Sequence, residues 1–238
     1  MKVFLEIGYT NSKFANDNNE DITLLPSSTY NLEHFLNHFD FVNDKLYILN
    51  NNTKLISLLN SFKHHNNYFL FDHNINHLDL KISPNINYDE LGDDLRFLIY
   101  YLNQIENKDV VLMSDGSCLV TIVKQDHLIN SISINLGLST SLEVINSKFG
   151  LTTNRTFFNQ HGTNTNDALA LGEYLMFRGI LMSTLENFHI KDNLIILCGN
   201  GFNEVWVNSF KKITKLKVEY YPNLVLKTFK KWCLDNFH

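Results

Sequence analysis

The chain has 238 residues, of which 44% are hydrophobic and 19% are charged, and its formal net charge is −5. This content suffices for one large domain or two smaller ones, and the acidic balance gives no reason to expect direct binding to nucleic acid, which requires clustered Lys and Arg. The 3 cysteines are far apart, no signal peptide is evident and no apolar run approaches the roughly 20 residues of a membrane span, so we expect a cytoplasmic protein without disulfides or membrane contact.

The first part of the chain alternates short apolar stretches with amphipathic ones. Val3–Ile7 predicts a buried strand, and Ile22–Leu25 predicts a second strand after an Asn- and Asp-rich turn. A helix is expected after Gly92, with Asp93 and Asp94 in its first turn, where the helix dipole favours negative charge. Other elements expected here are helices over Asn31–His38 and Leu55–Phe62 and strands over Leu46–Leu49 and Tyr68–Phe71.

The second part opens with strands and continues with longer helices. Val110–Met113 predicts a strand that stops at Ser114–Ser117, and the longest helical pattern is Asp167–Phe188, with Thr165 as its N-cap. Trp206 and Trp232 lie in apolar-patterned segments and are expected in the core. Other elements expected here are strands over Cys118–Val123, Leu128–Leu136 and Leu194–Leu197 and helices over Ser139–Phe149 and Leu224–Phe237.

The chain contains a weak internal repeat. Val3–Lys13 and Val110–Thr121 both run from an apolar strand through an acidic position and a glycine into a second segment. This pattern predicts two similar α/β halves, residues 1–107 and 108–238, with a nucleotide held between their two turns. Asp72, His73 and His77 lie in an Asn-rich context typical of a loop, so we do not expect them to bind a metal.

The segment FLEIGYTNSK, residues 4–13, has two interpretations. It is either an N-terminal hairpin or a phosphate-binding turn. Gly8 permits close approach of a ligand to the backbone, while Thr10, Asn11 and Ser12 supply hydrogen-bond donors and Lys13 supplies a positive charge. The segment alone leaves both interpretations open.

A series of segments carries a resemblance to a known family over nearly the whole chain. In order, they are FLEIGYTNSKF, NYDELGDDLR, VVLMSDGSCLVTI, ISINLGLSTSLEVI, TNDALALG, IILCGNGF and YPNLVLKTF. Together they resemble the motifs of type III pantothenate kinases, also called Bvg accessory factor proteins. The resemblance implies duplicated ribonuclease H-like halves of the actin, hsp70 and acetate kinase type. It also implies a homodimer that phosphorylates pantothenate with ATP, Mg²⁺ and K⁺ or NH₄⁺, the first step of coenzyme A biosynthesis.

The resemblance also implies roles for individual residues. Asp94 would be the base that accepts the proton of the pantothenate hydroxyl. The ATP-binding residues would be Glu6, Ile7, Gly8, Tyr9, Thr10, Asn11, Ser12, Lys13 and Ser117, with Glu6 also holding Mg²⁺ through water. Pantothenate would contact Tyr88, Gly92, Asp93, Asp94, Leu95, Arg96 and Thr165, and the monovalent cation would lie at Ser114 or Asp115. Asp94 and Thr165 could instead be helix caps, Asp93 a solvated cap and Tyr88 a core residue.

The sequence departs from the family pattern at several of these positions. Glu6 replaces an Asp, Tyr9 replaces an Asn, and Leu95 stands where the family has Arg, with Arg96 one position later. Ser114 aligns with the cation-binding Asp, and Asp115 follows it. A second hypothesis is therefore a degenerate relative that binds a nucleotide but transfers phosphate poorly. A third is an accessory protein that regulates transcription without contacting DNA.

Overall fold

The computed structural model describes residues 1–18, 21–71, 78–107, 109–151, 162–190 and 194–237. The chain forms two compact units. The first consists of Met1–Ile105 together with Asn223–His238, and the second is Glu106–Pro222. The C-terminal segment therefore belongs to the first unit, whereas the sequence repeat had assigned it to the second half.

The first unit is built on a five-stranded sheet with the order β3-β2-β1-β4-β5. Its central strand β1 is antiparallel to β2 and parallel to β4. The strands are β1 (Lys2–Ile7), β2 (Asn11–Asn16), β3 (Thr23–Pro26), β4 (Lys45–Asn50) and β5 (Tyr68–Phe71). The helices are α1 (Thr29–Asn37), α2 (Ile56–Ser61), α3 (Asp93–Gln104) and α7 (Leu224–Asn236), with 3-10 turns at η1 (Thr53–Leu55) and η2 (Tyr88–Glu90).

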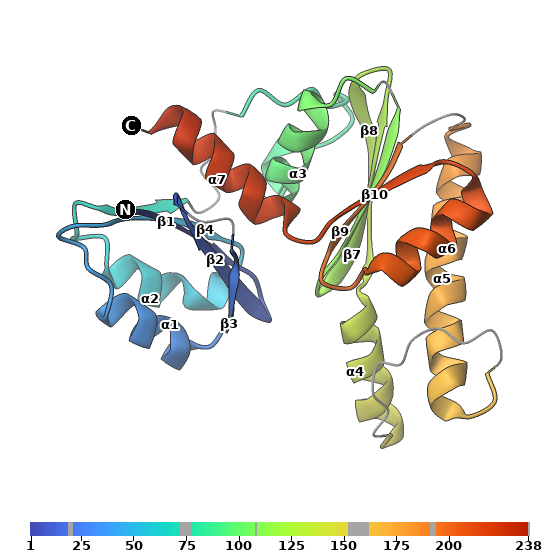
Figure 1. The fold of residues 1–238 in the computed structure, drawn as a ribbon, viewed down its shortest axis with the longest axis horizontal. Helices are drawn as coiled ribbons and strands as arrows, with labels where there is room; N and C mark the ends of the chain where they lie inside the picture. Colours follow the sequence, from blue (N-terminus) through green and yellow to red (C-terminus); the bar gives the residue numbers. More distant parts are fainter. Residues whose placement is uncertain (19–20, 72–77, 108, 152–161, 191–193, 238) are drawn as a thin grey trace. The chain divides into compact units, whose positions relative to one another are not determined.

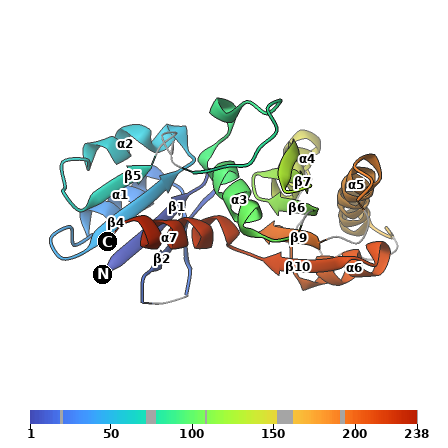
Figure 2. The ribbon, with the colours of Figure 1, turned by 90° about the horizontal axis from the view of Figure 1, so that it is seen from above.

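Both faces of this sheet are covered by helices, because the side chains of a strand alternate between the two faces. Leu5 and its same-face neighbours pack in one apolar cluster with residues of α1 and α2. On the other face, the ring of Phe4 meets Phe229 of α7 with centroids 6.5 Å apart. The ring centroid of Phe97 in α3 lies 5.3 Å from that of Phe229 and 5.6 Å from that of Trp232. Figures 1 and 2 show α1 and α2 on the sheet face opposite α7.

The second unit repeats this plan with a five-stranded sheet of order β10-β9-β6-β7-β8. Its strands are β6 (Val110–Asp115), β7 (Cys118–Gln125), β8 (Leu128–Leu136), β9 (Leu194–Gly199) and β10 (Lys217–Tyr221). Its helices are α4 (Leu138–Phe149), α5 (Thr165–Asn187) and α6 (Glu204–Thr214). Val111 and Met113 of β6 share one core cluster with Phe177 and Leu181 of α5 and Phe210 of α6.

Most predicted elements are present, and the differences have identifiable causes. Strand β2 was missed because Asn11–Asn16 is mostly polar, and β6 extends through Asp115, past the predicted stop. The N-cap of α5 is Asn164, whose side chain accepts a hydrogen bond from the Asp167 amide, so the prediction of Thr165 as N-cap was wrong. Helix α6 and strand β10 were not predicted.

Helix α5 is long and apolar. By length and composition alone it could cross a membrane, because it has 23 residues and a mean hydropathy of 1.2 in its most apolar window, of which 28% is buried. It nevertheless contributes Tyr174, Phe177, Leu181 and Leu185 to the core of the second unit. A core helix of a soluble domain passes the same test, so this feature is weak evidence for a membrane span.

Candidate functional site

In the first unit, the acidic residue of β1 lies buried opposite a lysine. Glu6 is paired with Lys13 across the β1–β2 hairpin, and it is only 8% exposed. The Lys13 Nζ atom lies 3.6 Å from Glu6 Oε1. The other carboxylate oxygen, Oε2, is buried and makes no hydrogen bond of ordinary geometry within the described residues. Glu6 is thus a buried carboxylate near the end of a central strand, and the Lys13 ammonium and the Leu226 backbone stabilise its charged form.

The electrostatic surroundings of Glu6 link it to Asp94. Burial raises the pKa of Glu6 above its ordinary value, and the Lys13 ammonium opposes this effect. The negative charge of Asp94 raises the pKa of Glu6 further. Glu6, Lys13 and Asp94 therefore belong to one electrostatic cluster, although Asp94 is far from the other two in sequence.

The carboxyl ends of the parallel strands β1 and β4 bring this cluster together. The Asn51 amide donates to the Ile7 carbonyl over 2.9 Å, which joins the segment after β4 to the end of β1. The Asn51 side-chain oxygen then accepts the backbone N–H of Asp94 over 3.2 Å. Asn52 Nδ2 donates to the Gly8 carbonyl over 3.4 Å. The sequence analysis did not predict a role for Asn51 and Asn52, because a run of Asn residues is typical of a loop. Their position directly after a predicted strand could have indicated that they lie at the site.

The turn after β1 requires a glycine and directs its bulky neighbour outward. The Gly8 amide donates to the Asn11 carbonyl over 3.1 Å, and a Cβ atom on Gly8 would lie 2.9 Å from that carbonyl oxygen. Tyr9 is 54% exposed, so the substitution that departs from the family pattern is accommodated without disturbing the core. The backbone of Thr10 accepts the Ser27 amide over 3.0 Å.

Several residues predicted to bind ATP lie on β2 or in the core instead of in the turn. Asn11, Ser12 and Lys13 are strand residues, so the hairpin interpretation of this segment is correct for the backbone. Ser12 is fully buried, and its hydroxyl is 2.7 Å from that of Ser27. Ile7 is also fully buried. Exposed groups that could face a phosphate are therefore concentrated at residues 9–11, with Lys13 held by Glu6.

The first turn of α3 contains a buried ion pair. Asp93 is fully buried and Arg96 is 3% exposed, and Arg96 Nη1 lies 3.3 Å from Asp93 Oδ1. Arg96 Nη2 donates to the Tyr88 carbonyl over 3.2 Å, and its guanidinium carbon lies 4.5 Å from the centre of the Tyr88 ring. The interpretation of Asp93 as a solvated cap was wrong, because this carboxylate neutralises a buried guanidinium.

The neighbouring positions explain how the displaced arginine is accommodated. Leu95, which stands where the family has Arg, is buried at 7% exposure. Half-buried Asp94 accepts the Leu95 amide at Oδ1 over 2.9 Å within the first turn of α3, whose N-cap is Gly92. Gly92 precedes the helix, and a Cβ atom there would lie 2.8 Å from Asp94 Oδ1. Asp94 is thus not the N-cap of α3, and its negative charge acts on the Glu6 carboxylate.

The acidic residue of the second hairpin has a different environment. Asp115 is 2% exposed at the end of β6, and its Oδ1 atom accepts the Leu138 amide at the start of α4 over 3.0 Å. Added Cβ atoms on Gly137 and Gly201 would meet the Asp115 carboxylate or its adjoining backbone. Gly199 has a φ of +89° and lies against the Asp115 backbone. Asp115 therefore organises three loop segments of the second unit.

The remaining predicted residues lie beside Asp115, on α5 or outside the described residues. Ser114 and Ser117 are half-buried, and the Ser117 carbonyl accepts the Gly137 amide over 3.1 Å. Thr165 is exposed in the first turn of α5. Asp72, His73 and His77 lie outside the described residues. Among the residues that are described, no three His, Cys, Asp or Glu side chains come together as a metal site.

Comparisons with known proteins concern the fold. No family model matches the sequence, and a search of the curated proteins finds no match. A solved structure from Campylobacter jejuni, of a protein assigned to the Baf family of transcriptional activators, matches with a TM-score of 0.64 at 20% identity and 98% coverage of each chain. A structure assigned as a 2-dehydro-3-deoxygalactonokinase from Sinorhizobium meliloti matches with a TM-score of 0.59 at 8% identity, covering 100% of this chain and 99% of that one.

A third structure, from Bacteroides thetaiotaomicron, has an actin-like ATPase fold and an unknown function. It matches with a TM-score of 0.45 at 9% identity, covering 97% of this chain and 95% of that one. Each described unit has a mixed five-stranded sheet that opens with three consecutive strands. The chain shares its fold with a Baf family protein along nearly its whole length, and the predicted fold class of two similar α/β halves is confirmed.

Proposed function

We propose that the protein is an ATP-dependent kinase that phosphorylates the hydroxyl group of pantothenate to give 4'-phosphopantothenate. The observation that carries the proposal is the cluster of Asp94, Glu6 and Lys13 at the end of β1, beside an exposed glycine turn. The actin-like fold, which implies nucleotide binding, and the fold likeness to a Baf family protein support it. The residue resemblance supplies the substrate.

In the proposed reaction, Asp94 accepts a proton. The pantothenate hydroxyl oxygen attacks the γ-phosphorus of ATP, the bond between that phosphorus and the bridging oxygen breaks, and ADP leaves. The hydroxyl proton passes to the Asp94 carboxylate. Asp94 is half-buried and its backbone is fixed by Asn51, so it is held in one orientation at the start of a helix. A fixed carboxylate near the attacking oxygen is what such a transfer needs from the protein.

Glu6, Lys13 and the glycine turn would act on the phosphates. The exposed backbone around Gly8 would approach the phosphate oxygens, and Lys13 would supply a positive charge. Glu6 fits the predicted water-mediated role toward Mg²⁺, because its Oε2 atom is free of hydrogen bonds of ordinary geometry and Asp94 adds a second carboxylate nearby. Bound Mg²⁺ would neutralise charge that develops on the phosphates.

The potassium prediction has less support from the residues. Asp115 is buried against Gly137 and Gly201 and accepts the Leu138 amide, which does not fit an open cation ligand. We therefore assign no part of the proposed reaction to a monovalent cation. A homodimer and a cytoplasmic location remain part of the proposal, supported by the family resemblance, and light scattering on the purified protein tests the former.

The test is a kinase assay with ATP, Mg²⁺ and pantothenate, with and without K⁺. We expect turnover by the wild type and a loss of about 10²- to 10⁴-fold in Asp94→Asn, which removes the proton acceptor but keeps the shape of the side chain. Asp79→Asn, which alters an exposed carboxylate of the same unit, is the matched control and should leave the rate unchanged. Equal rates for wild type and Asp94→Asn would contradict the assigned base.

A second candidate function rests on the departures from the family pattern. Leu95 is buried and Tyr9 occupies the phosphate turn, so a nucleotide-binding relative with poor transfer is the alternative. ATP binding by calorimetry, without pantothenate turnover under any cation, would favour it. An accessory role in transcription is a further alternative, which the net charge of −5 does not favour as direct contact with DNA.

A further inference from the structure

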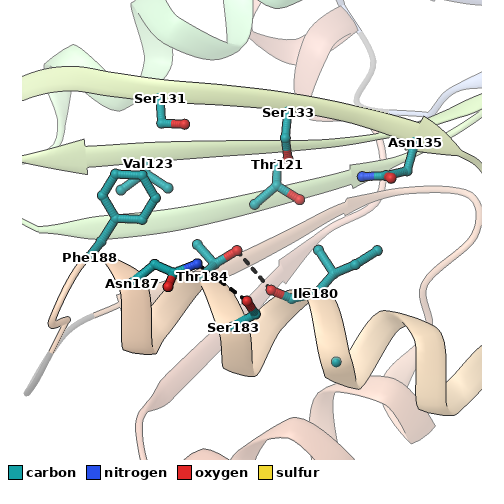
Figure 3. A pocket seen from close by; sticks show the side chains of 11 residues that line it. Thr121, Val123, Ser131, Ser133, Asn135, Ile180, Ser183, Thr184, Asn187 and Phe188 are labelled. Carbon is teal, nitrogen blue, oxygen red and sulfur yellow. Dashed lines mark hydrogen bonds between the residues drawn. The ribbon is translucent and has the colours of Figure 1, made fainter.

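The second unit contains a pocket that the proposed kinase reaction does not use. It has a volume of about 440 Å³ and lies between the sheet and the C-terminal half of α5 (Figure 3). It is lined by Thr121, Val123, Ser131, Ser133, Asn135, Gly179, Ile180, Ser183, Thr184, Asn187 and Phe188. No residue that the sequence assigned to ATP, pantothenate or a metal is among them.

The side of β8 that faces α5 is polar. Ser131, Ser133 and Asn135 line the pocket together with residues of α5, as Figure 3 shows. Because side chains alternate along a strand, Ile134 and Leu136 point to the opposite face, where they are 61% and 51% exposed. Ser133 and Asn135 are exposed and β8 is the edge strand of its sheet, so their hydroxyl and amide groups are accessible to a small molecule.

A buried hydroxyl on the neighbouring strand adds a second, independent observation. Thr121 is 2% exposed and pairs with Ser133 in the β7–β8 register. Its Oγ1 atom has no hydrogen-bond partner within the described structure. Buried hydroxyls are normally satisfied, because a buried polar group without a partner destabilises the protein. Thr121 lines the pocket, so a ligand there can complete its hydrogen bonding.

The lining defines the chemistry of the ligand. None of the lining side chains is ionisable, and their hydroxyl and amide groups both donate and accept hydrogen bonds. Val123 and Phe188 add an apolar surface at one end, and Ile180 adds an apolar side chain on the helix (Figure 3). Two of the helix groups already bond locally, since Thr184 donates to the Ile180 carbonyl and Asn187 donates to Ser183. We propose that this pocket binds a small uncharged polyhydroxylated molecule, of the sugar or polyol class.

A single substitution on α5 can block the pocket. Gly179 lines it, and a Cβ atom there would meet nothing within 4 Å, so a side chain can be added without a clash. Gly172 lies on the same helix with equally open surroundings but does not line the pocket. Leu is a better helix former than Gly, so Gly179→Leu and Gly172→Leu should both fold. Circular dichroism of both variants measures their helix content and so tests whether they fold.

The experiment is a ligand-detected NMR titration of the full chain with glucose, myo-inositol and glycerol as probes. We expect binding of at least one probe by the wild type, no binding by Gly179→Leu and unchanged binding by Gly172→Leu. Thr121→Val, which removes only the hydroxyl, should weaken binding about tenfold. Glucose 6-phosphate should bind more weakly than glucose, because the lining offers no cation.

Two results would overturn the proposal. One is the absence of binding by the wild type to all of these probes. The other is binding that persists in Gly179→Leu, which would place the ligand elsewhere. The kinase assay is independent of this titration, because Gly179 and Thr121 are not assigned to the reaction. Failure of either proposal is therefore distinguishable from failure of the other.

Discussion

The hairpins that open the two units use similar sequences for different purposes. In the first, Glu6 faces Lys13, lies near Asp94 and keeps one oxygen free of hydrogen bonds of ordinary geometry. In the second, Asp115 accepts the Leu138 amide and is enclosed by glycines. Both carboxylates are buried at the end of a central strand. An acidic residue before a glycine turn therefore indicates the end of a strand. The groups that contact this residue decide whether it can take part in a reaction.

The largest effect should come from filling the space around Asp115. Gly199→Ala would place a Cβ atom against the Asp115 backbone at a φ of +89°, so we expect a loss of more than about 4 kcal/mol in unfolding free energy. Urea denaturation measures it. Gly172→Ala is the control, because its Cβ meets nothing and Ala favours a helix by about 1 kcal/mol. Equal stability of Gly199→Ala and wild type would show that Asp115 is not tightly enclosed.

The first unit also contains a carboxylate with a structural role, Asp93, which can be compared with Asp115 of the second unit. Asp93→Ala would leave the Arg96 guanidinium buried without its counter-ion, and we expect a loss of about 3 kcal/mol. Replacing both partners with apolar residues, Asp93→Leu with Arg96→Met, should recover part of that loss. Denaturation of the single and double variants tests this. An unaffected single variant would mean that Arg96 can reach solvent.

A smaller effect separates the roles of the two hairpin carboxylates. Asp115→Ala removes the acceptor of the Leu138 amide and should cost about 2 kcal/mol, whereas Asp115→Asn keeps an acceptor oxygen and should cost less than about 1 kcal/mol. Denaturation of both variants gives the difference. If Asp115→Asn were as unstable as Asp115→Ala, the negative charge and not the hydrogen bond would be the stabilising feature.

The smallest effect is the pH dependence that Glu6 introduces. Because burial and Asp94 raise the pKa of Glu6 in the folded protein, the folded state holds this proton more tightly than the unfolded chain. Stability should therefore fall as the pH rises above the ordinary pKa of 4.5 toward the raised value. Glu6→Gln should flatten this slope above about pH 4.5, because it removes the group that binds the proton. Lys13→Met, which removes the opposing charge, should steepen it, and a shallower slope would contradict the assignment.

The sequence predicted the fold because its strongest signals are local. The apolar runs of β1, β4, β6 and β9 and the helical spacing of α3 and α5 each determine an element without help from distant residues. Strand β2 escaped prediction because its polar residues pair across a hairpin, and pairing is not visible in composition. Asn164, not Thr165, caps α5, since both residues suit that position and only the backbone decides between them.

The site was harder to predict because its environments depend on tertiary contacts. The burial of Asp93 follows from its pairing with Arg96, and an acidic residue in the first turn of a helix is ordinarily exposed. The link between Glu6 and Asp94 depends on the meeting of β1 and β4 at Asn51, which requires the parallel register. The family motifs identified Glu6, Asp93 and Asp94 as site residues, but they did not indicate which side chains these residues contact.

The return of α7 to the first unit has a consequence for synthesis on the ribosome. Phe229 and Trp232 complete the core that Phe4 and Phe97 begin. Two further hydrogen bonds join the ends of the chain, from Lys2 Nζ to the Phe237 carbonyl and from Lys230 Nζ to the Asn16 carbonyl, each over 2.6 Å. The unit whose synthesis begins first therefore cannot finish folding until α7 has emerged, so the second unit has the earlier opportunity to complete its core.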